Sequence, residues 1–429
     1  MNRRDLVKAL GAGLVTAGAN RKSSAIPHAQ GGFKAAPETF TLNAQTVVKL
    51  KDGRLLLMTG SMDARYSADR GRTWSESSPL IVEAGKKVPP LQFDGLSLIR
   101  LARGGLAVCY LSRNEMKGIS LLFRKSVDEG KTWSTPVTIC YSPPDVQPGY
   151  LSGFYDQMVQ LSTGRLVVPL RWAFTGEAPV QKGESPGGYG VIGGHRFKAE
   201  GHGHVPEMDI SFVYYSDDEG QTWSRSKGDL MGWTKDGWLL DCDEPNAAEL
   251  PDGRLLMFFR GLVGRILVSY SEDQGVTWTL PEPSELASST SPSRLRRIPG
   301  TNDLIAVWNH VSGDEIRRGY RRGRLVSAIS SDSGKTWKHF KILEISPGLD
   351  KVPDVQPDPE IHFVRGRDEL GELPDGFGIY HYPNLVFIDD QAFLMFGVHE
   401  YKLKADKSKL QHLPSHRLRV LPKKWFYET

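Results

Sequence analysis

Five near-copies of the pattern S-x-D-x-G-x-T-W constrain the fold of this chain more than any other feature of its sequence. We call these segments boxes, and they are "SADRGRTW" (67–74), "SVDEGKTW" (126–133), "SDDEGQTW" (216–223), "SEDQGVTW" (271–278) and "SSDSGKTW" (330–337). Successive box aspartates lie 59, 90, 55 and 59 residues apart. A period in the fifties is typical of chains that repeat one supersecondary unit, so we expect one repeat array rather than several separate domains.

Each box combines the residues of a tight turn with a large aromatic ring. The Asp carboxylate accepts hydrogen bonds from the N–H groups of its own turn, and Gly adopts the positive φ that such turns require. Trp contributes a large surface for packing. We therefore expect a structural role for the boxes, with their tryptophans packed in the apolar layers between adjoining sheets. These tryptophans are Trp74, Trp133, Trp223, Trp278 and Trp337.

A second repeat lies upstream of each box and predicts a β-hairpin. Each copy has a β-rich run, a turn signal such as Asp-Gly or Thr-Gly, and a second apolar run. The six copies are "TVVKLKDGRLLLM", "LSLIRLARGGLAVCY", "QMVQLSTGRLVVPL", "NAAELPDGRLLMFF", "SRLRRIPGTNDLIAVW" and, after the last box, "NLVFIDDQAFLMF".

Six strand-pair repeats predict an all-β fold, namely a six-bladed β-propeller with four-stranded antiparallel blades that occupies residues 37–429. The sixth blade, 380–429, has no box, and we expect a strand from near 37–42 to complete it. The interval of 90 residues contains a stretch rich in Gly and His, 175–204, without a strand pattern. We interpret this stretch as a loop inserted between the second and third strands of blade three.

The overall composition excludes some classes of protein. A net charge of +4, from 54 basic and 50 acidic residues, gives a mixed surface without the basic run that nucleic-acid binding needs. Three scattered cysteines form neither a metal-ligand spacing nor a disulfide framework. At the N-terminus, Arg3 and Arg4 precede a short apolar stretch that ends in Ala-Gly-Ala. We expect residues 1–19 to be a twin-arginine-type signal peptide, and the protein to be periplasmic or extracellular without a membrane span.

The boxes resemble the Asp-boxes, or bacterial neuraminidase repeats, of the sialidase superfamily, and the resemblance covers roughly residues 40–400. Members of this family include several kinds of glycan-directed enzyme and also binding proteins. The resemblance implies an exo-acting glycoside hydrolase that cleaves a terminal, acidic sugar from a glycan without a metal or an organic cofactor.

Candidate site residues are found by aligning the six strand pairs on their turns. In a propeller, the residues that begin the innermost strands converge at one face, around a central funnel. These segments are "NAQ" (43–45), "DGL" (94–96), "YDQ" (155–157), "EPN" (244–246), "SPS" (291–293) and "YPN" (382–384). Glu244 and Tyr382 therefore occupy equivalent positions two blades apart.

A carboxylate near a phenol has a specific chemical use. Tyr ionises near pH 10, so it needs a neighbouring base to act as a nucleophile. Sialidases are the glycosidases that use Tyr in this way, because their sugar carries a carboxylate that would repel an anionic nucleophile. The resemblance thus implies Tyr382 as the nucleophile and Glu244 as its base.

Two arginines resemble the second and third substrate-clamping arginines of the family. Arg260 follows Glu244 by 16 residues, and Arg322 precedes its box serine by eight. An Arg side chain suits this purpose because its planar group binds a carboxylate through two parallel hydrogen bonds. Asn43 stands where the family has its first arginine, so a neutral sugar or a uronic acid is an alternative substrate.

The general acid has three candidates. Asp63, after the first strand pair, matches the family's position best, and Asp94 and Asp156 are alternatives that face the predicted funnel. Besides the catalytic residues, we expect substrate contacts from Arg260, Arg322, Asp94, Asp156, Tyr155 and His381.

Two other functions remain open on the sequence alone. A polysaccharide lyase or hydrolase for a uronic-acid-containing or neutral glycan would not need the missing arginine, and its base would be His381 or His310. A propeller that binds a glycan without turnover is the other alternative.

Overall fold

The computed structural model describes residues 39–428, apart from 92–95, 114–117, 143–149, 154–155, 176–186, 199–206, 234–238, 314, 316–321 and 350–365. Strands β1–β32 and one 3-10 helix, η1 (Lys423–Phe426), are its named elements, so the expected all-β class is confirmed. The signal predicted for residues 1–19 lies outside the described residues. Within them, no helix has the length and apolar character of a membrane span.

Six antiparallel sheets dominate the structure, and we number them in chain order. Sheet 1 contains β2 (Thr46–Lys49), β3 (Leu55–Met58), β4 (Asp63–Ser67) and β5 (Ser78–Pro79). Sheet 2 contains β8 (Ser97–Arg100), β9 (Leu106–Arg113), β10 (Ile119–Ser126) and β11 (Val137–Ser142). Sheet 3 contains β12 (Tyr150–Ser152), β13 (Val159–Gln160), β14 (Leu166–Thr175), β17 (Glu207–Ser216) and β18 (Ser224–Arg225).

The second half of the chain forms the other three sheets. Sheet 4 contains β21 (Asp243–Glu249), β22 (Leu255–Arg260), β23 (Arg265–Ser271) and β24 (Glu282–Ala287). Sheet 5 contains β25 (Arg294–Arg297), β26 (Leu304–Asn309), β27 (Arg324–Ser330) and β28 (Lys338–Ile345). Sheet 6 contains β30 (Phe377–Ile388), β31 (Gln391–Leu403), β32 (Leu410–Pro422) and β1 (Thr39–Phe40). All six predicted strand pairs are present, and β1 completes sheet 6 as expected, with Thr39 opposite Arg419.

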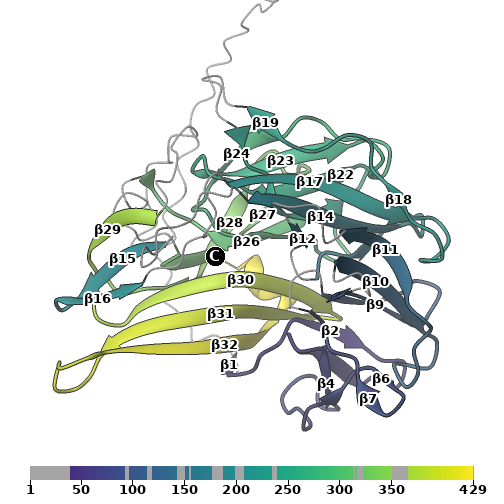
Figure 1. Ribbon diagram of the computed structural model, residues 1–429, viewed down its shortest axis with the longest axis horizontal. Helices are drawn as coiled ribbons and strands as arrows, with labels where there is room; N and C mark the ends of the chain where they lie inside the picture. The colour runs from purple at the N-terminus through teal and green to yellow at the C-terminus, as the bar shows by residue number, and fades with distance from the viewer. Residues whose placement is uncertain are drawn as a thin grey trace, which may run out of the picture.

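Each sheet packs against the next through its own cluster of buried apolar side chains. Five such clusters join consecutive sheets, and a sixth, which includes Val47 and Phe393, joins sheet 6 to sheet 1. The last sheet accordingly lies beside the first, with the yellow strands β30–β32 next to the purple β2 (Figure 1). Burial of these apolar faces is the main stabilising contribution to such a structure.

The five boxes form the same hydrogen-bonded turn. In the third box, Ser216 Oγ donates to Asp218 and accepts from the N–H of Gly220, while Thr222 donates to Asp218 through both its N–H and its hydroxyl. The same four hydrogen bonds occur in each of the other boxes. The residue before the box Gly is left-handed, as at Glu219 with φ of 55°.

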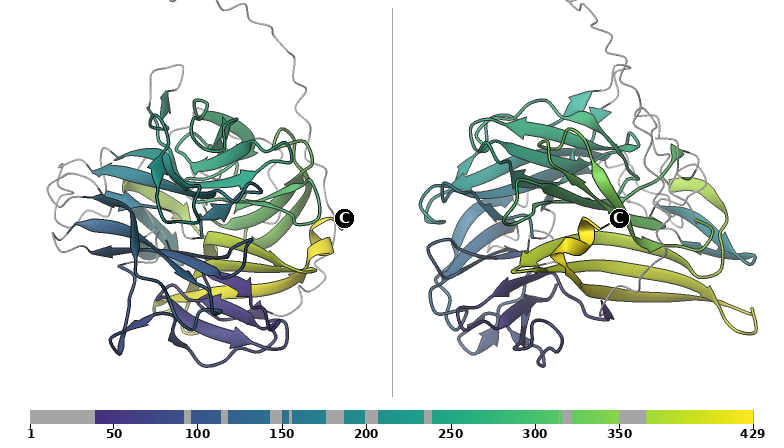
Figure 2. Two further views of the ribbon diagram at one scale, coloured as in Figure 1. Left: turned by 90° about the vertical axis from the view of Figure 1, so that its right-hand side faces the viewer. Right: turned by 180° about the vertical axis from the view of Figure 1, so that it is seen from behind.

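Each box tryptophan packs in a different cluster between sheets, as predicted. Trp133, for example, packs between sheets 1 and 2, and Trp337 between sheets 4 and 5. Sheet 6 has no box, and the cluster between sheets 5 and 6 contains Trp425 and Phe426 of η1 instead. This helix lies against β27 and β32 near the C-terminus (Figure 2).

The inserted segment lies between the second and third strands of sheet 3, as predicted, but the expectation of a loop without strands was wrong. It contains β15 (Gly187–Ile192) and β16 (His195–Lys198), and β15 pairs in parallel with β29 (Gly366–Glu372). Strand β15 is hydrogen-bonded to a strand far along the chain, so its own residues need not show the pattern of a local hairpin. The remaining strands form two small hairpins, β6 (Val82–Glu83) with β7 (Lys86–Lys87) and β19 (Gly232–Trp233) with β20 (Leu239–Leu240).

Candidate active site

Glu244 and Tyr382 each lie in a β-bulge, and the two bulges have the same register irregularity. Asp243 lies opposite Arg260 and Asn246 opposite Phe258, so β21 has one residue more than β22 between these pairs. Strand β30 shows the same irregularity between His381 and Asn384. A bulge of this kind redirects a side chain and is common beside active sites.

The backbone at both bulges is strained in the same way. Glu244 has φ of 45° and Tyr382 has φ of 52°, and a left-handed conformation costs a non-glycine residue about 1–3 kcal/mol. Pro245 and Pro383 follow, and proline is tolerated in a strand at a bulge because its missing N–H is not required there. The repeated Glu-Pro-Asn and Tyr-Pro-Asn sequences therefore correspond to one backbone geometry.

The asparagine that ends each bulge is fully buried and anchors it to other strands. Asn246 donates to the carbonyl of Ser293 at 2.8 Å and accepts from the N–H of Leu295 at 2.7 Å. Asn384 donates to the carbonyl of Gln45 at 2.7 Å and to the carboxylate of Asp156 at 2.8 Å. Side-chain hydrogen bonds thus connect each bulge to neighbouring sheets.

Arg260 connects Glu244 to sheet 5. Its Nη1 atom lies 3.1 Å from Glu244 Oε2 and 3.5 Å from Asp243 Oδ2, and its Nε donates to Thr290 Oγ1 at 3.3 Å. All three charged side chains are buried. Burial opposes the charge of Arg260, yet the two carboxylates raise its pKa above the ordinary value, so this arginine stays protonated.

Arg322 joins Tyr382 to the same group of residues. The guanidinium carbon of Arg322 lies 6.0 Å from the centre of the Tyr382 ring, and Nη2 donates to the carbonyl of Thr290 at 3.3 Å. Both arginines therefore contact Thr290. The structure brings Glu244, Arg260, Arg322 and Tyr382 together from sheets 4, 5 and 6, and we call these four residues the central cluster.

The arginines also set the charge of Glu244. Burial raises the pKa of this carboxyl group, but Arg260, Arg171 and Arg322 together lower it below the ordinary value. The three arginines therefore favour the ionised form of Glu244.

A second layer of buried charges lies behind Glu244, and the sequence analysis did not identify it. Arg171 on β14 contacts Asp243 at 2.6 Å and Asp209 at 2.8 Å, and the N–H of Asp209 donates to Asp241 at 2.7 Å. Burial, reinforced by Asp209 and Asp243, raises the pKa of Asp241 well above its ordinary value. The alternation of acidic residues in "DCDE" (241–244) was an available signal, because alternate residues of a strand share one face.

Asp63, the favoured candidate for the general acid, is the first residue of β4. It forms an ion pair with Lys87 at 2.6 Å and accepts from Ser61 at 2.7 Å. Burial raises the pKa of Asp63, but Lys87 and the hydroxyl of Ser61 outweigh it, so the net shift is downward. A general acid at neutral pH benefits from a raised pKa, so the lowered pKa of Asp63 does not favour its role as the acid, and that role stays a prediction.

Asp156 is buried and already paired. Its carboxylate contacts Arg296 and Asn384, both at 2.8 Å, and only 3% of the residue is exposed. The other two candidates in this region, Asp94 and Tyr155, lie outside the described residues. Asn43, which the resemblance predicts to stand in place of an arginine, is exposed just ahead of β2.

The two histidines of the alternative hypothesis differ in position. The ring of His381 lies 5.6 Å from that of Tyr382 and 4.5 Å from that of His399. His310 follows β26, and burial, together with Arg324 and Arg265, lowers its pKa to about 3, so its ring is neutral. Within the described ranges, no group of three or more His, Cys, Asp or Glu side chains is arranged to hold a metal ion.

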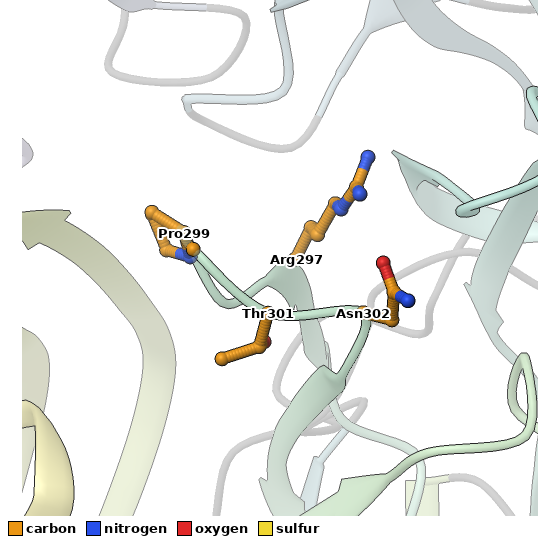
Figure 3. Close-up of a pocket in the computed structure, with 5 residues that line it drawn as sticks. Arg297, Pro299, Thr301 and Asn302 are labelled. Carbon is orange, nitrogen blue, oxygen red and sulfur yellow. The ribbon is translucent and has the colours of Figure 1, made fainter.

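A surface pocket lies elsewhere, at the turn between β25 and β26. Its lining residues are Arg297, Pro299, Gly300, Thr301 and Asn302 (Figure 3). This turn is at the opposite end of β25 from Leu295, which contacts Asn246. None of the predicted site residues lines it.

Comparisons with known proteins agree with the fold. The chain is similar to the solved structure of a protein of unknown function from Dyadobacter fermentans, with 16% identity over 90% of this chain and 99% of that chain, and a TM-score of 0.51. It is also similar to the Hadza microbial sialidase Hz136, with 16% identity over 88% of this chain and a TM-score of 0.50. The match covers 65% of that sialidase, less than two thirds of its length. No curated protein matches the chain in sequence.

A protein-family model, described as a BNR repeat-like domain, matches residues 98–395. The match covers more than half of the chain and includes four of the five boxes, Glu244, Arg260, Arg322 and Tyr382. The chain therefore belongs to the BNR repeat-like domain family, as its resemblance to sialidases indicated.

Proposed function

We propose that this protein is an exported, exo-acting glycoside hydrolase of the sialidase type, whose residues 37–429 form a closed six-bladed β-propeller. The six apolar clusters between successive sheets, including the one between sheets 6 and 1, support the closed ring. One observation carries the enzymatic part of the proposal. Glu244 and Tyr382 occupy equivalent bulges, and Arg260 and Arg322, which share Thr290, join them in one cluster.

The proposed reaction proceeds through two displacements. Glu244, kept ionised by the surrounding arginines, takes the proton of the Tyr382 hydroxyl as the phenol oxygen attacks the anomeric carbon. The bond to the leaving oxygen breaks, and Asp63 donates a proton to that oxygen. Asp63 then takes a proton from water, which attacks the anomeric carbon, and Tyr382 leaves as a phenolate that regains its proton from Glu244.

The sugar that fits the central cluster best is one with an acidic group. Arg322 lies beside the Tyr382 ring, and a guanidinium group there would pair with a carboxylate on the sugar. Arg260 is already paired with Asp243 and Glu244, and Asn43 carries no positive charge. We therefore expect weaker selection for an acidic sugar than in an enzyme with three free arginines. Digestion of sialosides, uronic-acid glycosides and neutral glycosides in parallel identifies the sugar.

Substitution of Tyr382 and Glu244 tests the mechanism. We expect Glu244→Gln to lower kcat on the cleaved fluorogenic glycoside by about 10²- to 10⁴-fold, the usual contribution of general acid–base catalysis, and Tyr382→Phe, which removes the nucleophile itself, to lower it at least as much. Tyr380→Phe and Glu249→Gln, on the same strands β30 and β21, are the matched controls and should keep their activity. Full activity in Tyr382→Phe and Glu244→Gln would remove this pair from the mechanism.

A lyase for a uronic-acid polysaccharide is the second candidate, and the position of His381 favours it. The His381 and Tyr382 rings lie in contact, so an imidazole and a phenol are available as a base and an acid. A lyase produces an unsaturated uronate that absorbs in the ultraviolet, whereas a hydrolase does not. Product absorbance during digestion of polyuronates therefore separates the two reactions, and glycan binding without any product would favour the binding-protein alternative.

A further inference from the structure

Asp156, just before β13 of sheet 3, connects that sheet to four others. Its N–H donates to the carbonyl of Leu96, just before β8 of sheet 2, at 2.7 Å. Its carboxylate accepts from Arg296 of sheet 5 and from Asn384 of sheet 6, both at 2.8 Å. Asn384 also donates to Gln45 of sheet 1. We call Asp156, Arg296 and Asn384 the hub.

The hub is densely hydrogen-bonded, with Asp156 and Asn384 buried and Arg296 half-buried. The Asp156 carbonyl accepts from Arg296 at 2.8 Å and from Arg294 at 3.2 Å, and Arg296 Nη2 also lies 3.2 Å from Asn384 Oδ1. Asp156 is left-handed, with φ of 53°, as are Glu244 and Tyr382. Because Asp156 and Arg296 neutralise each other away from water, loss of either partner would leave an uncompensated buried charge.

We propose that Asp156 is a positioning residue for Tyr382 that acts through Asn384, rather than the general acid; this inference rests on the proposed function. Asn384 is the residue at which the ladder between β30 and β31 resumes after the bulge. Pro383 has no N–H, so regular ladder hydrogen bonds do not hold the bulge in place. The side-chain amide of Asn384 anchors the bulge instead. It donates to two acceptors, the carboxylate of Asp156 and the carbonyl of Gln45.

The bulge at Glu244 offers an internal comparison. Asn246 has the same position there, but its partners are the backbone groups of Ser293 and Leu295 and not an ionisable side chain. A change at Asp156 should therefore disturb the Tyr382 bulge and leave the Glu244 bulge intact.

Leaving-group dependence separates positioning from acid catalysis. A general acid protonates the leaving oxygen, so its loss affects poor leaving groups much more than good ones. A positioning residue affects both alike, because the nucleophile itself is displaced. A displacement of about 1 Å at a reacting group can lower a rate about 100-fold.

The first experiment measures kcat and KM of Asp156→Gly on two aryl glycosides of the cleaved sugar, one with a good and one with a poor leaving group. Gly tolerates the left-handed conformation and removes the carboxylate oxygen that accepts from both Asn384 and Arg296. We expect kcat to fall by about 100-fold on both substrates, with little change in KM. A loss confined to the poor leaving group would identify Asp156 as the acid and overturn the inference, as would unchanged activity.

The second experiment does not depend on activity. Amide hydrogen exchange is followed by mass spectrometry in peptides that cover 377–388 and 243–249. We expect Asp156→Gly and Asn384→Ser to accelerate exchange in 377–388 only, and Asn246→Ser to accelerate it in 243–249 only. Unchanged exchange in 377–388 in both hub variants would overturn the inference.

The two variants also cover each other. If Asp156→Gly does not fold, Asn384→Ser tests the same tether while the Asp156–Arg296 pair stays intact, so the exchange result at 377–388 decides alone. If Tyr382→Phe keeps full activity, the proposed function fails, yet the exchange experiment still shows whether Asp156 holds this bulge.

Discussion

The aspartates of the box turns have lowered pKa values, whereas Asp241, among the charged groups around Glu244, has a raised pKa. In the boxes, hydrogen bonds from Thr73 and Thr132 lower the pKa of the half-buried Asp69 and Asp128 to about 2. Behind Glu244, burial and neighbouring carboxylates raise the pKa of Asp241. A box aspartate is thus satisfied by its own turn, whereas an aspartate behind Glu244 depends on side chains from other sheets.

This difference shows that each box is stabilised by its own residues, whereas the charges behind Glu244 depend on contacts between sheets. Each box closes its hydrogen bonds within eight residues, so it can be repeated without change. The closest charge partner of Asp243 in sheet 4 is Arg171 of sheet 3, at 2.6 Å, so the balance of charges behind Glu244 depends on how these two sheets pack. We expect substitutions to cost most where a charge depends on a distant partner.

The largest effect should follow from Arg171→Met. This change removes the partner of Asp209 and Asp243, which are almost fully buried, at 2.8 and 2.6 Å. Breaking a buried pair on one side costs about 3–5 kcal/mol. Chemical denaturation measures the free energy of unfolding of the variant and of the wild type.

The matched control for this comparison is Arg254→Met. Arg254 pairs with Asp252 at 2.7 Å in an exposed turn of sheet 4. An exposed pair contributes about 0.2–1 kcal/mol. Equal losses in the two variants would show that the buried charges are not what distinguishes the region behind Glu244.

Glycine substitutions test how tightly a box is packed. Gly220 has φ of 91°, and a Cβ there would lie 2.2 Å from the ring of Phe123 in sheet 2, whereas Gly253, with φ of 85°, has open space. We expect Gly253→Ala to cost about 1–2 kcal/mol for its backbone conformation. Gly220→Ala should cost about 1–3 kcal/mol more, because the box must also move away from Phe123. Thermal unfolding measures both, and similar losses would mean that the contact with sheet 2 contributes little.

The smallest effects concern pH, and they have opposite signs in the two regions. A box aspartate with a lowered pKa, such as Asp218 at about 2, stabilises the fold above its ordinary pKa of 3.8, and this contribution disappears as the pH falls toward 2. Asp241 has a raised pKa, so its contribution is present below pH 3.8 and is lost as the pH rises.

We therefore expect Asp218→Asn to reduce the loss of stability between pH 4 and pH 2, and Asp241→Asn to reduce the loss above pH 4. Urea unfolding between pH 2 and pH 8 measures both slopes. If both variants changed the pH dependence of the free energy of unfolding in the same pH range, the two aspartates would not differ as described.

Local chemistry explains why the strand pairs were predictable. Turn signals such as Asp52-Gly53 and Asp252-Gly253 sit between two β-rich runs, and β2–β3 and β21–β22 have the predicted pairing. The pairing of β15 with β29 was not predictable in this way, because its partner lies far along the chain.

The candidate site was predictable only in part. The equivalence of Glu244 and Tyr382 followed from the alignment of the strand pairs, and their bulges share one register irregularity. The same alignment made Asp156 a candidate acid, since nothing in the sequence placed Arg296 or Asn384 beside it. The shared Pro-Asn dipeptide marked both anchoring asparagines, but its role becomes apparent only from their hydrogen bonds.

The amino-acid sequence by itself determined the repeating unit, because a hairpin turn and a box turn are each closed by contacts within a few residues. Tertiary structure decided which charges are buried and which partners neutralise them. A pairing such as that of Asp156 with Arg296 depends on how successive sheets pack, and burial then determines whether a carboxyl group is stabilised as an anion or held as an acid.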